Sequence, residues 1–224
     1  MKKNLINKKI LLSPTQLVGF LNCKFWVVHN YKGTRKKKIS FSKEVLFEKG
    51  REHEKNYLNK VLKKKYKNVV EIKGGSEEEK VKKTRKAIED GADVVYQGLL
   101  LENDWKGTPD FLIKQPDNEG YEVVDTKIST EAKVNHVMQI ASYTQLLSKK
   151  QNEVPKKMHV VLKNNETVSY STRENMAYFS INKERFEKFL KTDFIKKTKP
   201  QKCSFCQFCD YKDACREIWK KNDS

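Results

Sequence analysis

The sequence contains no long apolar run. None of its segments approaches the roughly 20 consecutive apolar residues that a membrane-spanning helix needs, and hydrophobic residues make up only 37% of the 224 residues. At the basic beginning of the chain, Asn7, Lys8 and Lys9 interrupt the apolar core that a signal peptide would require. We therefore expect a cytoplasmic protein with neither a membrane span nor a signal peptide.

Acidic residues are scarce relative to basic ones. The chain has 47 lysines and arginines but only 29 aspartates and glutamates, which gives a net charge of +18. Such an excess favours a polyanionic partner, above all nucleic acid, although a general richness in lysine would produce the same balance. The apolar runs at residues 93–101 and 121–128 argue against a wholly disordered chain.

The chain shows no internal repeat and no long linker, and its length suits a single domain. Helical and strand patterns alternate along it, which is typical of an α/β fold with helices around one mixed sheet. We expect helices from Ser13 onward and over Ser42–Lys65, Glu77–Asp90, Val134–Leu147 and Lys183–Lys197. We expect strands at Val69–Lys73, Val94–Leu101, Thr108–Lys114, Tyr121–Ile128, Met158–Leu162 and Thr167–Ser171.

Two acids and a lysine lie within segments that otherwise have the pattern of buried strands. Residues Pro116–Gly120 have strong turn chemistry and predict an antiparallel hairpin that can bring Asp110 and Asp125 together. Lys127 follows Asp125 by two residues, so both should face the same side of the strand. Thr126 should point away, with its backbone carbonyl still available as a ligand. The alternative is an exposed hairpin with ordinary surface charges.

Two close carboxylates repel each other and attract a hard cation such as Mg²⁺ or Mn²⁺. Such an ion would polarise a phosphodiester and lower the pKa of a bound water. Lys127 could orient that water or stabilise charge that develops on the phosphate.

The pattern of Asp110 and Asp125-Thr126-Lys127 resembles the signature of the PD-(D/E)XK nucleases. Gly50–Glu54 resembles the helical metal-binding histidine motif of the RecB-like branch, and Gln139–Tyr143 resembles its Gln-x-x-x-Tyr motif. The resemblance extends from Ser13 to Cys215 and implies a restriction-endonuclease-like α/β core. The chain is similar in these motifs to the CRISPR-associated exonuclease family four and to the nuclease domain of AddB.

The resemblance also implies roles for individual residues. It makes Asp110, Asp125 and Lys127 catalytic, and it makes Gln139 and Tyr143 contacts to DNA. The implied ligands of Mg²⁺ or Mn²⁺ are His53, Asp110, Asp125 and the carbonyl of Thr126. Without the resemblance, a lone histidine on a helix is usually structural. Gln139 and Tyr143, which share a helix face, could simply pack there.

Four cysteines lie close together near the C-terminus, with the spacing Cys203-x2-Cys206-x2-Cys209-x5-Cys215. In a cytoplasmic protein this density indicates a metal rather than a disulfide framework. Zinc and an iron–sulfur cluster are both chemically possible.

In the iron–sulfur RecB-like nucleases, one N-terminal cysteine joins three C-terminal ones. The resemblance therefore implies a [4Fe–4S] cluster held by Cys23, Cys206, Cys209 and Cys215. Residues 13–30 and 200–221 would form the cluster subdomain of a single nuclease domain, residues 1–224. Two departures are Lys24, where the family often has proline, and Cys203, which leaves open a local Zn²⁺ site made without Cys23.

Together these features predict a Mg²⁺- or Mn²⁺-dependent deoxyribonuclease, an exonuclease on single-stranded or frayed DNA. The alternative is an iron–sulfur or zinc DNA-binding subunit that cleaves little or not at all and acts with a helicase or integrase partner.

Overall fold

The structure is a computed structural model that describes residues 11–116, 120–151 and 153–222. The chain divides into two compact units. The core unit consists of Lys49–Ala177 and the described residues up to Pro14, whereas the cysteine unit combines Thr15–Glu48 with Tyr178–Ser224. The predicted absence of a signal peptide concerns residues 1–10, and much of the predicted turn concerns 117–119; both lie outside the described residues.

A six-stranded mixed sheet with the strand order β1-β2-β5-β6-β7-β8 forms the centre of the core unit. The pairs β1–β2 and β6–β7 are parallel and the other neighbours are antiparallel. This confirms the α/β class with a central mixed sheet. The strands are β1 (Val69–Glu71), β2 (Val94–Tyr96), β5 (Phe111–Lys114), β6 (Tyr121–Thr126), β7 (Lys157–Val161) and β8 (Thr167–Ser171).

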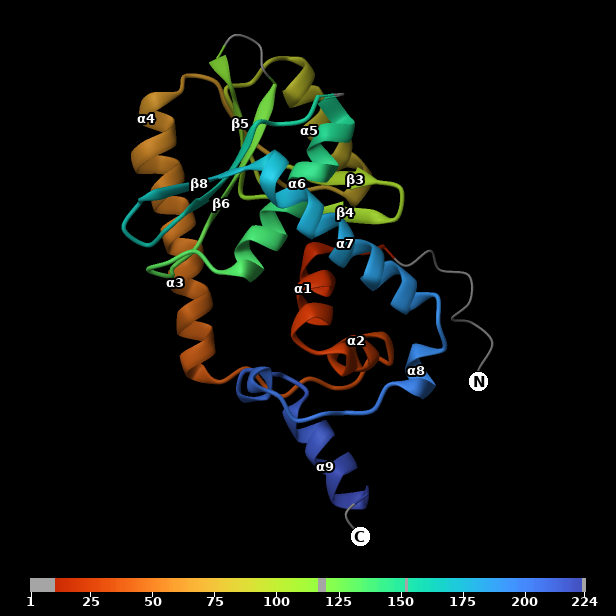
Figure 1. The fold of residues 1–224 in the computed structure, drawn as a ribbon. Coiled ribbons are helices and arrows are strands. Elements are labelled where there is room, and N and C mark those ends of the chain that lie inside the picture. Colours follow the sequence, from red (N-terminus) through yellow and green to blue (C-terminus); the bar gives the residue numbers. More distant parts are fainter. Residues whose placement is uncertain (1–10, 117–119, 152, 223–224) are drawn as a thin grey trace. The chain divides into compact units, whose positions relative to one another are not determined.

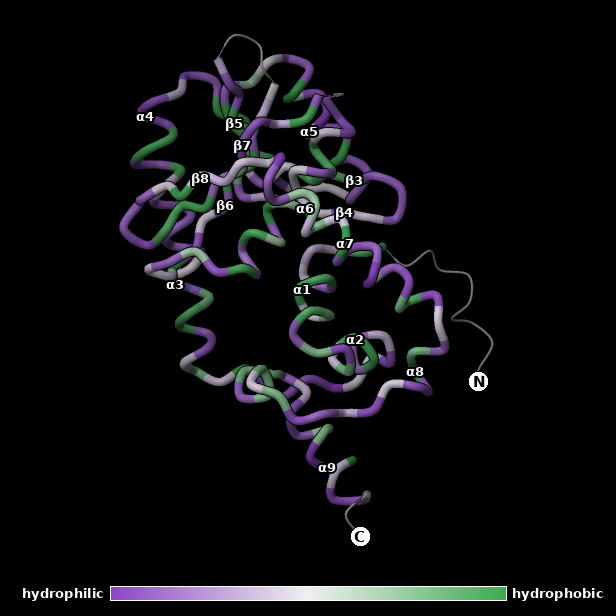
Figure 2. Tube along the Cα trace, viewed as in Figure 1, coloured by the Kyte–Doolittle hydropathy of each residue, from purple (hydrophilic) through white to green (hydrophobic). Residues whose placement is uncertain are grey.

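Burial explains why these segments form strands. All six residues of β6 are buried, because the strand lies in the middle of the sheet and both of its faces are covered. In Figure 2 the hydrophobic colour is concentrated on β5 and β7, whereas the α3–α4 segment alternates between hydrophobic and hydrophilic stretches. Only the last part of this segment faces the core, since Tyr57, Leu58 and Leu62 are buried whereas Leu46 and Phe47 are exposed.

Helices cover both sides of this sheet (Figure 1). Tyr57, Leu58 and Leu62 pack with Phe111 and Val124 of the sheet, and α6 packs against β6 and β7. A capping box between Ser76 and Glu79 begins α5, which contacts β2. The helical segments are α3 (Phe41–Tyr57), the π-helix η1 (Leu58–Leu62), α4 (Lys63–Lys65), α5 (Glu77–Glu89) and α6 (Val134–Gln151).

The expectation of one strand over Val94–Leu101 was wrong. Gln97 adopts a left-handed backbone conformation, with φ 57°, which an extended strand cannot accommodate. The chain therefore leaves the large sheet after β2, and its continuation forms a separate two-stranded sheet of β3 (Leu100–Glu102) and β4 (Trp105–Gly107).

The helix predicted over Lys183–Lys197 was also wrong in extent. The structure has α7 (Thr172–Leu190) and a short α8 (Phe194–Lys197) instead. Phe179, Asn182 and Phe186 are buried at helical spacing, so the inward-facing stripe begins before Lys183.

Two helices near the N-terminus and short helical segments near the C-terminus make up much of the cysteine unit. The ring of Phe20 packs against those of Phe186 and Phe189, with centroids 5.2 Å apart in both pairs. In the described part of the chain, no helix has the length and apolarity that crossing a membrane would require. The remaining elements are α1 (Pro14–Asn22), α2 (Lys24–Tyr31), the 3-10 helix η3 (Ser204–Gln207) and α9 (Lys212–Asn222).

Candidate active site

The hairpin of β5 and β6 brings the two predicted acids to the same end of the sheet. Phe111 pairs with Val124, and this register sets Asp110, which precedes β5, opposite Asp125 of β6. The backbone N–H and the hydroxyl of Thr126 both donate to Oδ2 of Asp110, each at 2.7 Å. The expectation that the side chain of Thr126 points away from the site was therefore wrong, because its hydroxyl holds Asp110.

The carboxyl group of Asp110 is unfavourable in its charged form. Burial raises its pKa well above the ordinary value of 3.8, and the negative charges of Asp125 and Glu54 raise it further. Lys127 and the hydrogen bond from Thr126 oppose this shift without cancelling it. The site thus concentrates more negative charge than its own lysine neutralises.

Lys127 supplies the positive charge of the site. Its ammonium group contacts Oδ2 of Asp125, which is only 1% exposed. Burial, the largest single influence, lowers the pKa of Lys127, but the charges of Asp125, Asp110 and Glu54 outweigh it and the pKa is raised. Lys127 lies just beyond the end of β6, where its backbone N–H donates to the backbone carbonyl of Val161 at 2.8 Å.

Two further residues extend this acidic group: Glu54, which lies within the Gly50–Glu54 motif but has no predicted role of its own, and Gln97. The side-chain amide of Gln97 donates to Oε1 of Glu54 and lies 3.5 Å from Oδ1 of Asp110. Its backbone N–H also donates to the carbonyl of Asp110, at 2.9 Å. The left-handed backbone of Gln97 thus serves to link the two acids, a function that no sequence pattern indicates.

His53 precedes Glu54 on α3. Its Nε2 atom is buried and has no hydrogen-bond partner among the described residues. An unpaired buried nitrogen is unfavourable and rare in folded proteins, and a metal ion is one partner that would satisfy it.

The Gln-x-x-x-Tyr pair lies on α6, as predicted from its spacing. The amide of Gln139 donates to the hydroxyl of Tyr143 at 2.9 Å. Burial and then the charge of Asp125 raise the pKa of Tyr143, which links this helix face to the acids. Gly107 of β4 leaves room for the Tyr143 ring of α6, since a Cβ at this position would lie 2.7 Å from that ring.

His136 is a further residue near this site that sequence reasoning missed. Burial, followed by the charges of Lys127 and Lys133, lowers its pKa to about 4. It precedes Gln139 by three residues and Tyr143 by seven on α6, and this helical spacing was the available signal.

The donor set fits a hard divalent cation. Asp110, Asp125 and Glu54 carry excess negative charge, and His53 offers an unpaired buried nitrogen. Within the described ranges, no group of three or more histidine, cysteine, aspartate or glutamate side chains has an arrangement that could already hold a metal ion. The carboxylates are instead engaged with protein partners, Asp110 with Thr126 and Asp125 with Lys127.

The cysteine unit brings its N-terminal and C-terminal cysteines near each other. All five cysteines are free. Sγ of Cys203 lies 3.8 Å from Sγ of Cys206 and 3.9 Å from the carbonyl oxygen of Asn22, the residue before Cys23. Burial raises the pKa of Cys215 to about 12, and the charges of Cys209, Cys23, Cys206 and Cys203 contribute in that order. The five thiols are therefore within electrostatic reach of one another.

His29 of α2 also belongs to this group, although no sequence pattern indicates it. Its Nε2 lies 3.2 Å from Sγ of Cys215, and its ring stacks on Tyr211. Burial lowers the pKa of His29, and the charge of Lys32 lowers it further. A neutral histidine in contact with a buried thiol would also suit a metal ligand or its support.

Comparison with known proteins defines the family. The chain belongs to the PD-(D/E)XK nuclease superfamily, whose family profile matches residues 35–216. The resemblance inferred from Asp110 and from residues 125–127 is thereby confirmed at the level of the superfamily. The chain is accordingly assigned to the hydrolytic nucleases.

Comparison with solved structures supports the fold. A candidate exonuclease from Eubacterium rectale aligns with a TM-score of 0.53 and 14% identity, over 97% of this chain and 92% of that one. The protein SSO0001 aligns with a TM-score of 0.41 and 14% identity, over 94% and 87% of the two chains. No curated protein matches the sequence significantly. At such identity, the first likeness shows a shared fold and no more.

The repulsion at Asp110 predicts a pH-dependent effect of Asp110→Asn on the metal-free protein. Because the folded-state pKa of Asp110 is raised, the wild type should lose stability as the pH rises through that pKa. The neutral asparagine does not lose stability in this way. The free energy of unfolding of Asp110→Asn, relative to that of the wild type, should therefore increase with pH. Urea unfolding with EDTA between about pH 5 and 8 measures it. An advantage that stays constant or shrinks with rising pH would argue against the buried repulsion.

Proposed function

We propose that this chain is a divalent-metal-dependent deoxyribonuclease that acts as an exonuclease on single-stranded or frayed DNA. The observation that carries the proposal is the pair of acids beside Lys127, in a member of a nuclease superfamily: Asp125 is buried and Asp110 is half-buried. The net charge of +18 supports a polyanionic substrate.

In this proposal His53, Asp110, Asp125 and the carbonyl of Thr126 hold Mg²⁺ or Mn²⁺. A bound ion of this kind polarises a phosphodiester and lowers the pKa of a water molecule. Hydrolysis joins the water oxygen to phosphorus and breaks the bond from phosphorus to a sugar oxygen, which takes up a proton. Lys127 faces the negative charge that develops on the phosphate during this exchange.

Gln139 and Tyr143 position the DNA strand in the same proposal. Their mutual hydrogen bond fixes both side chains on one face of α6, and the electrostatic influence of Asp125 on Tyr143 links that face to the reacting acids. A strand held there would present its phosphate to Asp110 and Asp125 without any base-specific contact.

Cleavage of end-labelled single-stranded DNA with Mn²⁺ tests the activity. Asp110→Ala should lose activity by at least about 100-fold, since it removes a ligand of the ion. Glu78→Ala, which removes an exposed acid on α5, should cleave as the wild type does. Blocking each end in turn identifies exonuclease action. Equal activity of the wild type and Asp110→Ala would refute the assignment, and DNA binding without cleavage under any divalent ion would favour a non-cleaving subunit.

We also propose that Cys23, Cys206, Cys209 and Cys215 hold a [4Fe–4S] cluster, with Zn²⁺ at the C-terminal cysteines as the alternative. Residues 13–30 and 200–221 would then form a cluster subdomain within a single nuclease domain, residues 1–224. The thiols gathered around Cys215 support a cationic partner, because burial and the neighbouring cysteines disfavour a bare thiolate there and a bound metal would stabilise one. Thiols that are all free suit a reducing compartment such as the cytoplasm.

Iron content and colour distinguish the two metal assignments. Cys23→Ala should lose the brown chromophore and its iron when the protein is purified without oxygen, whereas Cys203→Ala should retain both. The two substitutions remove the same group, so each controls for the other. Loss of iron from Cys203→Ala but not from Cys23→Ala, or a zinc-containing wild type without iron, would contradict the cluster.

A further inference from the structure

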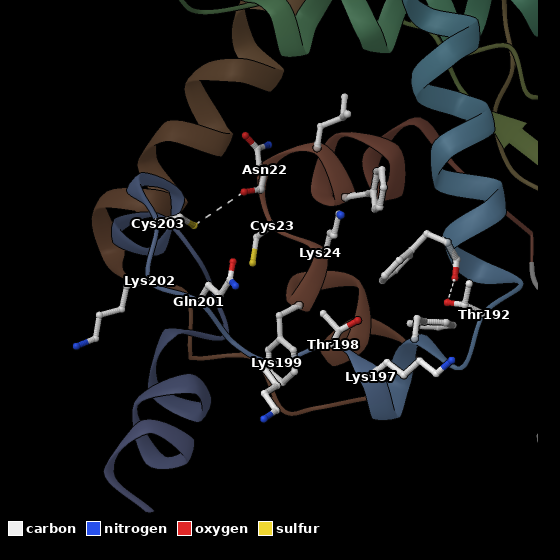
Figure 3. A pocket seen from close by; sticks show the side chains of 15 residues that line it. Asn22, Cys23, Lys24, Thr192, Lys197, Thr198, Lys199, Gln201, Lys202 and Cys203 are labelled. Atoms are coloured by element: carbon white, nitrogen blue, oxygen red, sulfur yellow. Dashed lines mark hydrogen bonds between the residues drawn. The ribbon is translucent and has the colours of Figure 1, made fainter. Parts of the chain in front are cut away.

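A pocket of about 620 Å³ lies within the cysteine unit. It is bounded by the junction of α1 and α2, the end of α7, α8 and the segment that leads to Cys203. In Figure 3, Cys203 and Thr192 lie on opposite sides of the pocket, and Lys24, Thr198 and Lys199 lie around its middle. This volume is within the range of about 300–1,000 Å³ that is typical of ligand sites.

The lining of the pocket carries charge of only one sign. Lys24, Lys197, Lys199 and Lys202 contribute to it, and no aspartate or glutamate is among the described residues that line it. Within the described part of the chain, none of these four lysines forms an ion pair with an acid. Lysines gathered without acidic partners repel one another and favour an anionic ligand.

Aromatic rings that pack against one another line part of the pocket. The ring of Phe189 lies 5.2 Å from that of Phe20 and 5.0 Å from that of Phe194, measured between centroids. Phe20 and Phe194 are buried, whereas Phe189 is partly exposed. Thr198 and Gln201 add uncharged polar groups to the lining. A partly exposed ring beside amide, hydroxyl and ammonium groups can contact a nucleobase and its phosphate together.

We propose that this pocket binds a segment of single-stranded DNA, with its phosphates on Lys24, Lys197 and Lys199 and a base against Phe189. The proposal rests on the proposed deoxyribonuclease function, because it assigns the chain a second contact to the same substrate. Single-stranded rather than duplex DNA is indicated, since a pocket of this volume, enclosed by several chain segments, admits a nucleotide but not a double helix.

Binding of a fluorescent single strand to the full-length protein, measured by anisotropy with EDTA present, tests the proposal. Lys197→Ala combined with Lys199→Ala removes two phosphate contacts from exposed side chains. The plot of log affinity against log salt should become shallower by about 1.4, because each contact to a single strand contributes about 0.7. At low salt the affinity should fall several-fold.

Lys80→Ala combined with Lys82→Ala is the matched control, since it removes the same charge from α5 in the core unit. This control should keep the slope and affinity of the wild type. Equal losses in both variants would overturn the pocket assignment, because they would show that the overall positive charge of the protein causes the effect. A larger loss for blunt duplex than for single strands would overturn the single-strand assignment.

Hydrolysis of a small phosphodiester, bis(p-nitrophenyl) phosphate, with Mn²⁺ separates this proposal from the proposed function. The pocket variant should retain the wild-type rate on this substrate, because it is too small to need a second contact. A wild type that hydrolyses neither this ester nor DNA refutes the nuclease, whatever the binding data show. An active wild type whose pocket variant binds single strands unchanged refutes the pocket alone.

Discussion

The electrostatic repulsion between Asp110 and Asp125 is the constraint around which the site is built. The β5–β6 register sets these acids opposite each other, with Asp125 buried and Asp110 half-buried. The surrounding groups reduce the resulting cost: Thr126 donates twice to Asp110, and Lys127 contacts Asp125. Glu54 adds a third negative charge and so works against this compensation. Three acids held together without a cation destabilise the fold. Unfavourable arrangements of this kind concentrate at functional sites.

The rest of the core unit holds this group of acids in position. The strand that carries Asp125 lies in the middle of the six-stranded sheet, covered on both faces. Helix α6 places Tyr143 near the acids, and Gly107 leaves room for its ring. The cysteine unit has a comparable constraint of its own, because five free thiols and His29 lie where α1 and α2 approach the segment from Cys203 to Cys215. In both units, side chains far apart in sequence come within electrostatic reach of one another.

Local patterns in the sequence predicted the hairpin and the acids, because turn residues and an apolar run fix them. They also predicted most helices and strands, including β8, whose bounds agree residue by residue. They could not predict Gln97, since its left-handed backbone is stabilised by contacts to Glu54 and Asp110 that only the folded chain creates. The contact between His29 and Cys215 spans 186 residues, and no local spacing records it. The early start of α7 was predictable in principle from the spacing of its buried residues.

The proposed activity requires Asp110 and Asp125 to form a site for a divalent ion. Titration calorimetry of Mn²⁺ into the metal-free protein tests this directly, without DNA and without turnover. We predict that the wild type binds Mn²⁺ and that Asp125→Asn, which keeps the shape of the side chain, weakens binding by at least about 10-fold. Glu78→Gln on α5 should bind as the wild type does. Equal affinity of the wild type and Asp125→Asn for Mn²⁺ would contradict the account.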